Sequence, residues 1–265
     1  MSVLSITETL EQMEPIARLT TDLRVAAAAM GVNEVRYLVD GYYTIQESRK
    51  TLGNQRFALS KSGEPVLLIS WLFDQASLLE GQIKRALDVW TDGTRVGQWE
   101  KSIYGIGPIL AAGFLAHIDI EKAPTVGHIW RFAGLDPTDK WEKGEKRPWN
   151  ADLKVLAWKA GQSFMKFYNR SDDIYGHVYS VRKALEQERN NAGLFADQAA
   201  AILANRKIGK DTEAYKHYTN GKLPPAHIDA RARRYAVKIY LAGLHEVMFF
   251  TRYDTLPPKP YVISH

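Results

Sequence analysis

The chain has 265 residues, of which 45% are hydrophobic, and a net charge of +5 at pH 7. This composition indicates a globular protein with a real core. No apolar run approaches the roughly 20 residues that a membrane-spanning helix needs, so no membrane partner is expected. The absence of cysteine excludes disulfides and thiolate metal sites and is compatible with a cytoplasmic location.

Charge is unevenly distributed along the chain. Residues 1–100 carry 10 Lys and Arg against 13 Asp and Glu, residues 101–190 carry 14 against 11, and residues 191–265 carry 11 against 6. The balance therefore changes from −3 to +3 to +5. A basic excess in one part of a chain is typical of proteins that bind a polyanion, although many other proteins share it.

The first part of the chain is predicted to be helical throughout. Helices are expected over 6–30, with Pro15 as an alternative start, over 33–59, and from Pro65 to about Trp90. Together they form a stalk or bundle over 1–92, and the turn at 91–94 separates it from a second domain over 93–265. The apolar stripes of two such long helices need a partner, so a homodimer is expected.

The second part is also predicted to be helical, which makes the fold all-α. Helices are expected over 172–190, 194–206, 211–219 and 226–252, with Asp172 and Asp173 at the start of the first. Between Pro137 and Trp149 the chain leaves the helical pattern for a small irregular or two-stranded excursion. The tail from Leu256 to Pro260 is expected to be extended, because adjacent prolines do not stay helical.

The segment Ser102–Leu115 carries the strongest functional signal. In SIYGIGPILAAGFL, two glycines flank one apolar residue ahead of a helix with small residues. Gly105 and Gly107 can adopt positive φ, Ile106 anchors the bend, and the following helix presents free N–H groups that bind phosphate. This is a helix-hairpin-helix pattern, which grips a DNA backbone without reading its sequence. An ordinary tight turn between two helices is the alternative.

Two further stretches follow this hairpin. The segment His128–Pro137 reads as a helix that ends in a Gly-Leu-Asp-Pro turn, and a polar stretch, Trp141–Arg147, precedes another helix from Asn150. This succession resembles the C-terminal domain of insertion-sequence transposases whose N-terminal half is an RNase-H-like domain, enzymes known as RNA-guided recombinases. The resemblance is clearest over residues 100–168 and implies action on DNA, with structured RNA as a further partner.

The sequence departs from this family in two ways. Lys143, in Lys-Gly-Glu-Lys, stands where the family has a serine that is thought to attack DNA. Residues 1–100 also show helices only, without the acidic residues on strands that would bind two magnesium ions. The chain is therefore expected to bind DNA rather than to catalyse its recombination, without metal or other cofactor. A divergent transposase or recombinase is the rival hypothesis, and RNA binding and a purely structural hairpin stay open.

Basic residues in three places are candidate phosphate contacts. Lys101 precedes the hairpin, the excursion carries several lysines and an arginine, and the last helix presents cations at helical spacing. Trp141 and Trp149 could stack on bases or cap the core. The complete expected DNA-binding set is Gly105, Ile106, Gly107, Lys101, Lys140, Lys143, Lys146, Arg147, Arg231, Arg234 and Lys238.

Overall fold

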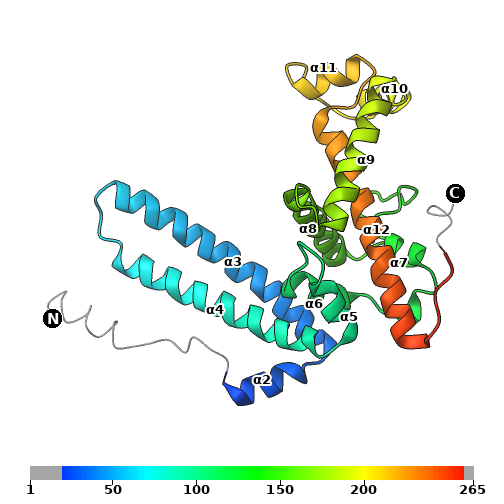
Figure 1. Ribbon diagram of the computed structural model, residues 1–265. Coiled ribbons are helices and arrows are strands. Elements are labelled where there is room, and N and C mark those ends of the chain that lie inside the picture. The colour runs from blue at the N-terminus through cyan, green and yellow to red at the C-terminus, as the bar shows by residue number, and fades with distance from the viewer. Residues whose placement is uncertain (1–19, 260–265) are drawn as a thin grey trace. The chain divides into compact units, whose positions relative to one another are not determined.

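The computed structural model describes residues 20–259 of the chain. Over these residues it contains eleven α-helices and one 3-10 helix, with no strand (Figure 1). The all-α prediction is confirmed. None of the described helices combines the length and apolar character that crossing a membrane would require. The described residues form two compact units, 20–98 with 111–117, and 99–110 with 118–259.

The first unit is dominated by a long helical hairpin. α3 (Val32–Lys61) and α4 (Leu67–Asp92) lie antiparallel, and the short α2 (Thr21–Ala28) packs on α4 (Figure 1). The expected helices over 33–59 and 65–90 are confirmed, with α4 starting just after Pro65. The helix expected over 6–30 is described only from Thr21, and both its expected start and the alternative start at Pro15 lie outside the described residues.

Apolar packing in this unit is concentrated at one end of the hairpin. Val35 and Val39 of α3 and Leu87 of α4 are buried, as is Phe114 in α6 (Pro108–His117). Arg36 fastens α3 to the end of α6 by donating from Nε to the carbonyl of Ala116 at 2.8 Å. By contrast, none of residues 40–86 is buried. The outer part of the hairpin is therefore a two-helix layer without a core of its own.

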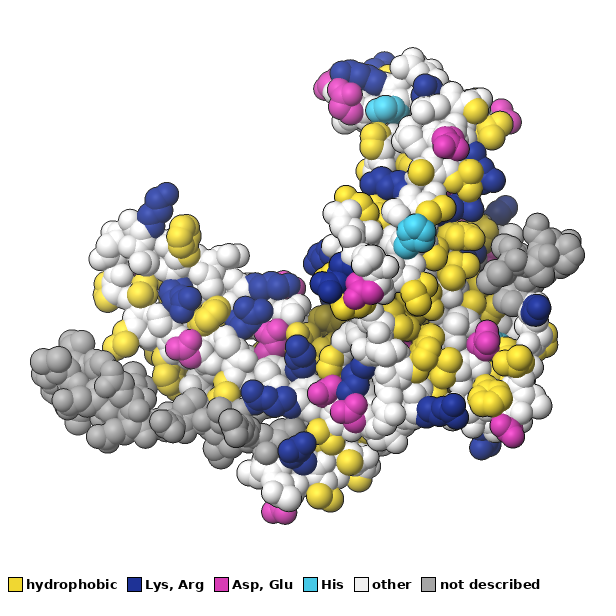
Figure 2. All heavy atoms as spheres, in the orientation of Figure 1, with side chains coloured by type: hydrophobic (Ala, Val, Ile, Leu, Met, Phe, Trp, Pro, Cys, Tyr) yellow, Lys and Arg dark blue, Asp and Glu magenta, His cyan; other side chains and the backbone are white. Residues whose placement is uncertain are grey.

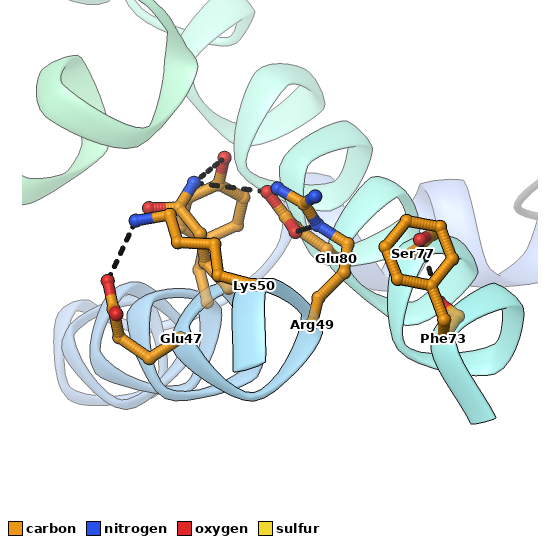
Figure 3. Close-up of polar contacts among 8 residues, drawn as sticks. Glu47, Arg49, Lys50, Phe73, Ser77 and Glu80 are labelled. Atoms are coloured by element: carbon orange, nitrogen blue, oxygen red, sulfur yellow. Dashed lines mark hydrogen bonds and ion pairs between the residues drawn. The ribbon is translucent and has the colours of Figure 1, made fainter. Parts of the chain in front are cut away.

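Polar contacts hold the outer part of the hairpin together. Arg49 of α3 pairs with Glu80 of α4, and Gln46 donates to the same carboxylate at 3.1 Å. Figure 3 shows Arg49 and Glu80 facing each other across the two helices, with Lys50 paired to Glu47 on α3 alone. Burial acts to raise the pKa of Glu80, but its bonds to Arg49 and Gln46 outweigh this and lower it.

The second unit is built around its last helix. α12 (Pro225–Tyr253) packs against α7 (Val126–Phe132), α8 (Ala151–Phe167) and α9 (Ile174–Asn191), and also contacts the 3-10 turn η1 (Ile120–Lys122). Tyr240 and Leu244 of α12 and Phe164 of α8 are fully buried in this core. Two predicted helix starts are confirmed. Asp173 caps α9 by accepting a hydrogen bond from the Gly176 N–H, and Asn150 caps α8 by accepting one from the Leu153 N–H.

A small helical pair forms one end of the second unit. Figure 1 shows α9 and the start of α12 running together toward α10 (Ala196–Asn205) and α11 (Glu213–Thr219). Phe195, Ala199, Leu223 and Ile228 form a separate apolar cluster there. Asn190 joins the pair to α9, because its amide donates to the Leu223 carbonyl at 2.9 Å and accepts from the Leu223 N–H at 2.8 Å.

The excursion after α7 is irregular. Residues 137–149 contain turns and no strand, so the irregular alternative holds and the two-stranded one is wrong. Gly134, with φ of +63°, ends the helical path after α7, and the Asn150 N–H donates to the Phe132 carbonyl at 2.9 Å. This backbone bond closes the excursion at its base.

Candidate nucleic-acid interface

Two short helices flank a tight bend in the segment where the sequence predicts the hairpin. α5 (Arg95–Lys101) ends just before residues 102–107, and α6 starts at Pro108. Ile106 is only 3% exposed, so it anchors the bend in the core as expected. Its N–H donates to the Ile103 carbonyl at 3.0 Å, which tightens the turn. The sequence pattern thus corresponds to a fixed bend rather than a loose loop.

Gly105 fixes the bend to α8. Its backbone has φ of +87°, a conformation that favours glycine, and a Cβ there would lie 2.7 Å from the Ser163 hydroxyl. That hydroxyl donates to the Gly105 carbonyl at 2.8 Å. Ser163 therefore has a structural role at the back of the bend.

Gly107 has a different role from the one expected. Its φ is not positive, so the expectation that it uses this freedom is wrong. It is exposed instead, and a Cβ built on it would meet no atom within 4 Å. The space beside Gly107 is therefore open, and the first-turn N–H groups of α6, among which Pro108 supplies none, have no intrahelical acceptor. This open approach is what a phosphate oxygen needs.

A cation that the sequence did not single out lies beside the bend. The Arg170 guanidinium lies 4.3 Å from the centre of the Tyr104 ring and donates to the Tyr104 hydroxyl at 3.1 Å. It also pairs with exposed Asp172 at 3.4 Å.

The excursion is held by a stack of aromatic and basic side chains. Arg147 lies over Trp141, Trp141 meets Trp149 edge to face at 6.5 Å, and the Lys154 ammonium lies 3.7 Å from the Trp149 ring centre. Trp149 is thus enclosed between neighbours and packs against the Gly134 turn. Trp141 remains 37% exposed, and Lys140, Lys143 and Lys146 are exposed around it.

The cations of α12 fall into two groups. Arg231 pairs with buried Glu186 at 2.6 Å, and Arg233 pairs with Asp229 at 2.7 Å. Arg234 and Lys238 form no ion pair within the described residues, and the Lys238 ammonium lies 5.1 Å from the Trp130 ring centre. Arg231 thus has an internal acidic partner, whereas Arg234 and Lys238 have no ion pair among the described residues.

Glu186 explains why Arg231 is held in place. Burial acts to raise the pKa of this carboxylate, but Arg231 and Arg182 overcome that effect and lower it. Arg189 also approaches the carboxylate, at 4.0 Å. Three arginines from α9 and α12 therefore surround one buried negative charge, so the positive charges outnumber the negative one at this place.

The excursion and α12 meet at a lysine that the sequence analysis missed. Burial lowers the pKa of Lys154, and the charges of Arg147 and Arg234 lower it further. Two separately predicted basic stretches, 87 positions apart, therefore converge on the start of α8. We call Arg147, Lys154, Arg234 and Lys238 the basic cluster. Helical spacing in α12 pointed to two of its members, but nothing local marked Lys154 as their neighbour.

The bend and the basic cluster use different faces of α8. Ser163, which holds Gly105, lies nine positions after Lys154, which is about two and a half helical turns. The two side chains consequently leave α8 on opposite sides. The bend and the basic cluster are thus two separate surfaces of the second unit rather than one continuous surface.

One comparison with known proteins gives a match. The family described as Transposase IS116/IS110/IS902 matches residues 101–147, which contain the bend, α6, α7 and most of the excursion. The match is consistent with a C-terminal transposase domain and relates this segment to transposition and DNA recombination. No curated protein and no solved structure matches the chain.

In the described part of the chain, no group of three or more His, Asp or Glu side chains could hold a metal ion. Lys143, which the sequence resemblance aligns with the family's serine, is an exposed residue of the excursion.

Proposed function

We propose that this chain binds duplex DNA by its phosphate backbone and serves as an accessory protein in the transposition or recombination of a mobile element. The observation that carries the proposal is the open backbone at Gly107, directly before α6 and inside the segment that matches the transposase family. Helix N-termini bind phosphate through N–H groups and the helix dipole, without reading bases.

Exposed cations support the same function. The candidate phosphate contacts from the sequence that stay open to solvent are Lys140, Lys143, Lys146, Arg147 and Arg234. Lys101 and Lys238 are half-buried. Arg231 is paired with Glu186, so it adds to the positive excess around that residue but is not a free charge. Each phosphate neutralised by such a cation releases counterions, so affinity should fall steeply with salt.

The α10–α11 end of the second unit adds charge of the same sign. Figure 2 shows Lys and Arg side chains at this end, mixed with Asp and Glu. The loop between the two helices exposes Arg206, Lys207 and Lys210. This end extends the basic surface that a long polyanion can contact, and structured RNA is the alternative partner that such a surface also fits.

A charge reversal at the bend tests the proposal. Gly107→Glu places a carboxylate where no atom lies within 4 Å, so the fold should persist while phosphate is repelled. Gly31→Glu is a matched control, because Gly31 is also an exposed glycine preceding a helix, with no atom near its Cβ position. Binding of labelled duplex DNA is measured by fluorescence anisotropy at several salt concentrations.

The proposal expects at least a tenfold loss of affinity for Gly107→Glu and none for Gly31→Glu. Equal binding by both variants would show that the bend only packs. If the parent does not bind duplex DNA at low salt, or binds structured RNA and not DNA, the proposed function is wrong. Circular-dichroism melts of both variants separate lost binding from unfolding.

A further inference from the structure

A cavity of about 180 Å³ lies between α8 and α12 in the second unit. Ala157 and Gly161 of α8 face Ala230 and Val237 of α12, and the Gly134–Leu135 turn closes one end. The two helices approach closely here, since a Cβ on Gly161 would lie 3.1 Å from Val237. The small side chains of α8 and α12 therefore leave an apolar space, and the longer side chains of Lys154, Trp158 and Arg234 surround it.

The size of this cavity limits what it can hold. Pockets for drug-sized molecules span about 300–1,000 Å³, so this one suits a smaller group. A single planar ring or a phosphate group falls in that range, whereas a stacked base pair does not.

Three cations line the cavity, and one of them, Arg233, is paired with Asp229. Lys154 and Arg234 both line it, and within the described residues neither forms an ion pair. Burial lowers the pKa of Arg234, and the charges of Arg231 and Arg233 lower it further, as Arg147 and Arg234 do for Lys154. Such mutual repulsion is relieved when an anion binds among the cations.

The rim also carries an exposed indole. Trp158 lines the cavity and is 60% exposed, which is unusual for so large an apolar side chain. It lies four positions after Lys154, so both side chains leave α8 on the same face. An exposed aromatic beside cations is the arrangement with which proteins stack a nucleobase while holding its phosphate.

We propose that this cavity and its rim bind one unpaired nucleotide of a DNA strand, with a ring of its base in the cavity against Trp158 and its phosphate outside at Lys154 and Arg234. The proposal rests on the proposed DNA binding and adds the form of DNA that is preferred. A base inside a duplex is stacked and paired, so only an unpaired or extruded one can enter. The Gly107 bend binds phosphates of the intact duplex, on the other face of α8.

Two DNA duplexes that differ by one nucleotide test this inference. One is fully paired, and the other carries a single unpaired nucleotide in the same sequence. Affinities for both are measured by anisotropy with the parent, with Trp158→Ala and with Tyr37→Ala. Tyr37 is the matched control, because it is an aromatic residue of α3 that is 79% exposed and lies in the other unit.

The parent should prefer the duplex with the unpaired nucleotide by about tenfold, the scale of one base–aromatic stack. Trp158→Ala should lose that preference yet bind the paired duplex as the parent does, and Tyr37→Ala should keep it. Arg234→Gln should weaken binding of the unpaired nucleotide and reduce the salt dependence by about one contact.

Each opposing result has a distinct meaning. A parent that binds both duplexes equally, or a Trp158→Ala variant that keeps the preference, overturns this inference and leaves the proposed DNA binding intact. Tighter binding of the equivalent bulged RNA overturns the assignment to DNA. Failure to bind any duplex at low salt overturns the proposed function itself.

Discussion

Glu100 is a carboxylic acid in a fully buried position of α5. Its Oε1 accepts a hydrogen bond from the Tyr240 hydroxyl, and its Oε2 is buried with no hydrogen-bond partner in the described part of the chain. Burial raises the pKa of Glu100 well above its ordinary value of 4.5. The folded state therefore holds a proton at this site that the unfolded chain releases above about pH 4.5.

This proton makes stability depend on pH. The unfolded chain binds fewer protons than the folded one above pH 4.5, so the free energy of unfolding should fall as pH rises. Glu100→Gln removes the titration and should flatten the slope by up to about 1.4 kcal/mol per pH unit. Urea unfolding from pH 5 to 8 measures the slope, with exposed Glu188→Gln as the control. Equal slopes in Glu100→Gln and the parent would mean that Glu100 is ionised in the fold.

The two glycines of the bend should respond differently to alanine. Gly105→Ala forces a side chain into positive φ and against Ser163, which should cost about 1–3 kcal/mol of stability. Gly107→Ala meets open space at an ordinary φ and should change stability little. Denaturant melts of the two variants check this, and equal losses would show that the bend relaxes around Gly105.

At the scale of elements, the α3–α4 hairpin lacks cover on its outer part. Leu68, Leu72 and Leu79 of α4 are 67%, 39% and 46% exposed although they share one side of the helix. Spacings of four and seven residues are those of a coiled-coil stripe. The homodimer stays a prediction, and this uncovered stripe is the surface on which it would form.

Charges on the stripe should disrupt such a dimer. A chain with Leu68→Glu and Leu79→Glu should sediment as the 30.0 kDa monomer, while the parent sediments at twice that mass at micromolar concentration. Leu194→Glu serves as control, since Leu194 is 68% exposed in the other unit. A parent that is monomeric throughout would refute the dimer, and an unchanged dimer in the double variant would place it elsewhere.

The excursion should contribute charge and little stability. Lys143→Ala and Arg147→Ala alter exposed side chains, so each variant should fold like the parent. Each should weaken duplex binding moderately, and the log–log salt slope should fall by about one contact for each lost phosphate partner. Binding curves at four salt concentrations measure this. An unchanged slope in both variants would mean that the excursion does not contact DNA phosphates.

At the scale of the whole molecule, the chain is expected to bind DNA without catalysing strand transfer. The sequence resemblance aligns Lys143 with the family's serine, and a lysine cannot form the serine's phosphodiester link to DNA. We therefore expect no strand transfer and no covalent adduct when the purified chain is incubated with DNA and magnesium. A protein–DNA adduct that disappears on mutation of one residue would make the chain a recombinase.

Features that depend on a few neighbouring residues could be predicted from the sequence. The helical pattern of the described chain, the Asp173 cap of α9 and the buried Ile106 between two glycines are of this kind. Each follows from periodicity, capping or backbone freedom within about ten residues. The family match falls on the same local pattern, at residues 101–147.

Only the tertiary structure decided which distant charges meet. Arg231 and Arg234 look alike along α12, yet Arg231 reaches Glu186, 45 positions earlier, and Arg234 lies near Lys154. Nothing in the sequence marked Trp158, which lies exposed at a cavity rim. The reason is physical: helix formation is set by local backbone and side-chain preferences, whereas burial and pairing depend on how α8, α9 and α12 pack together.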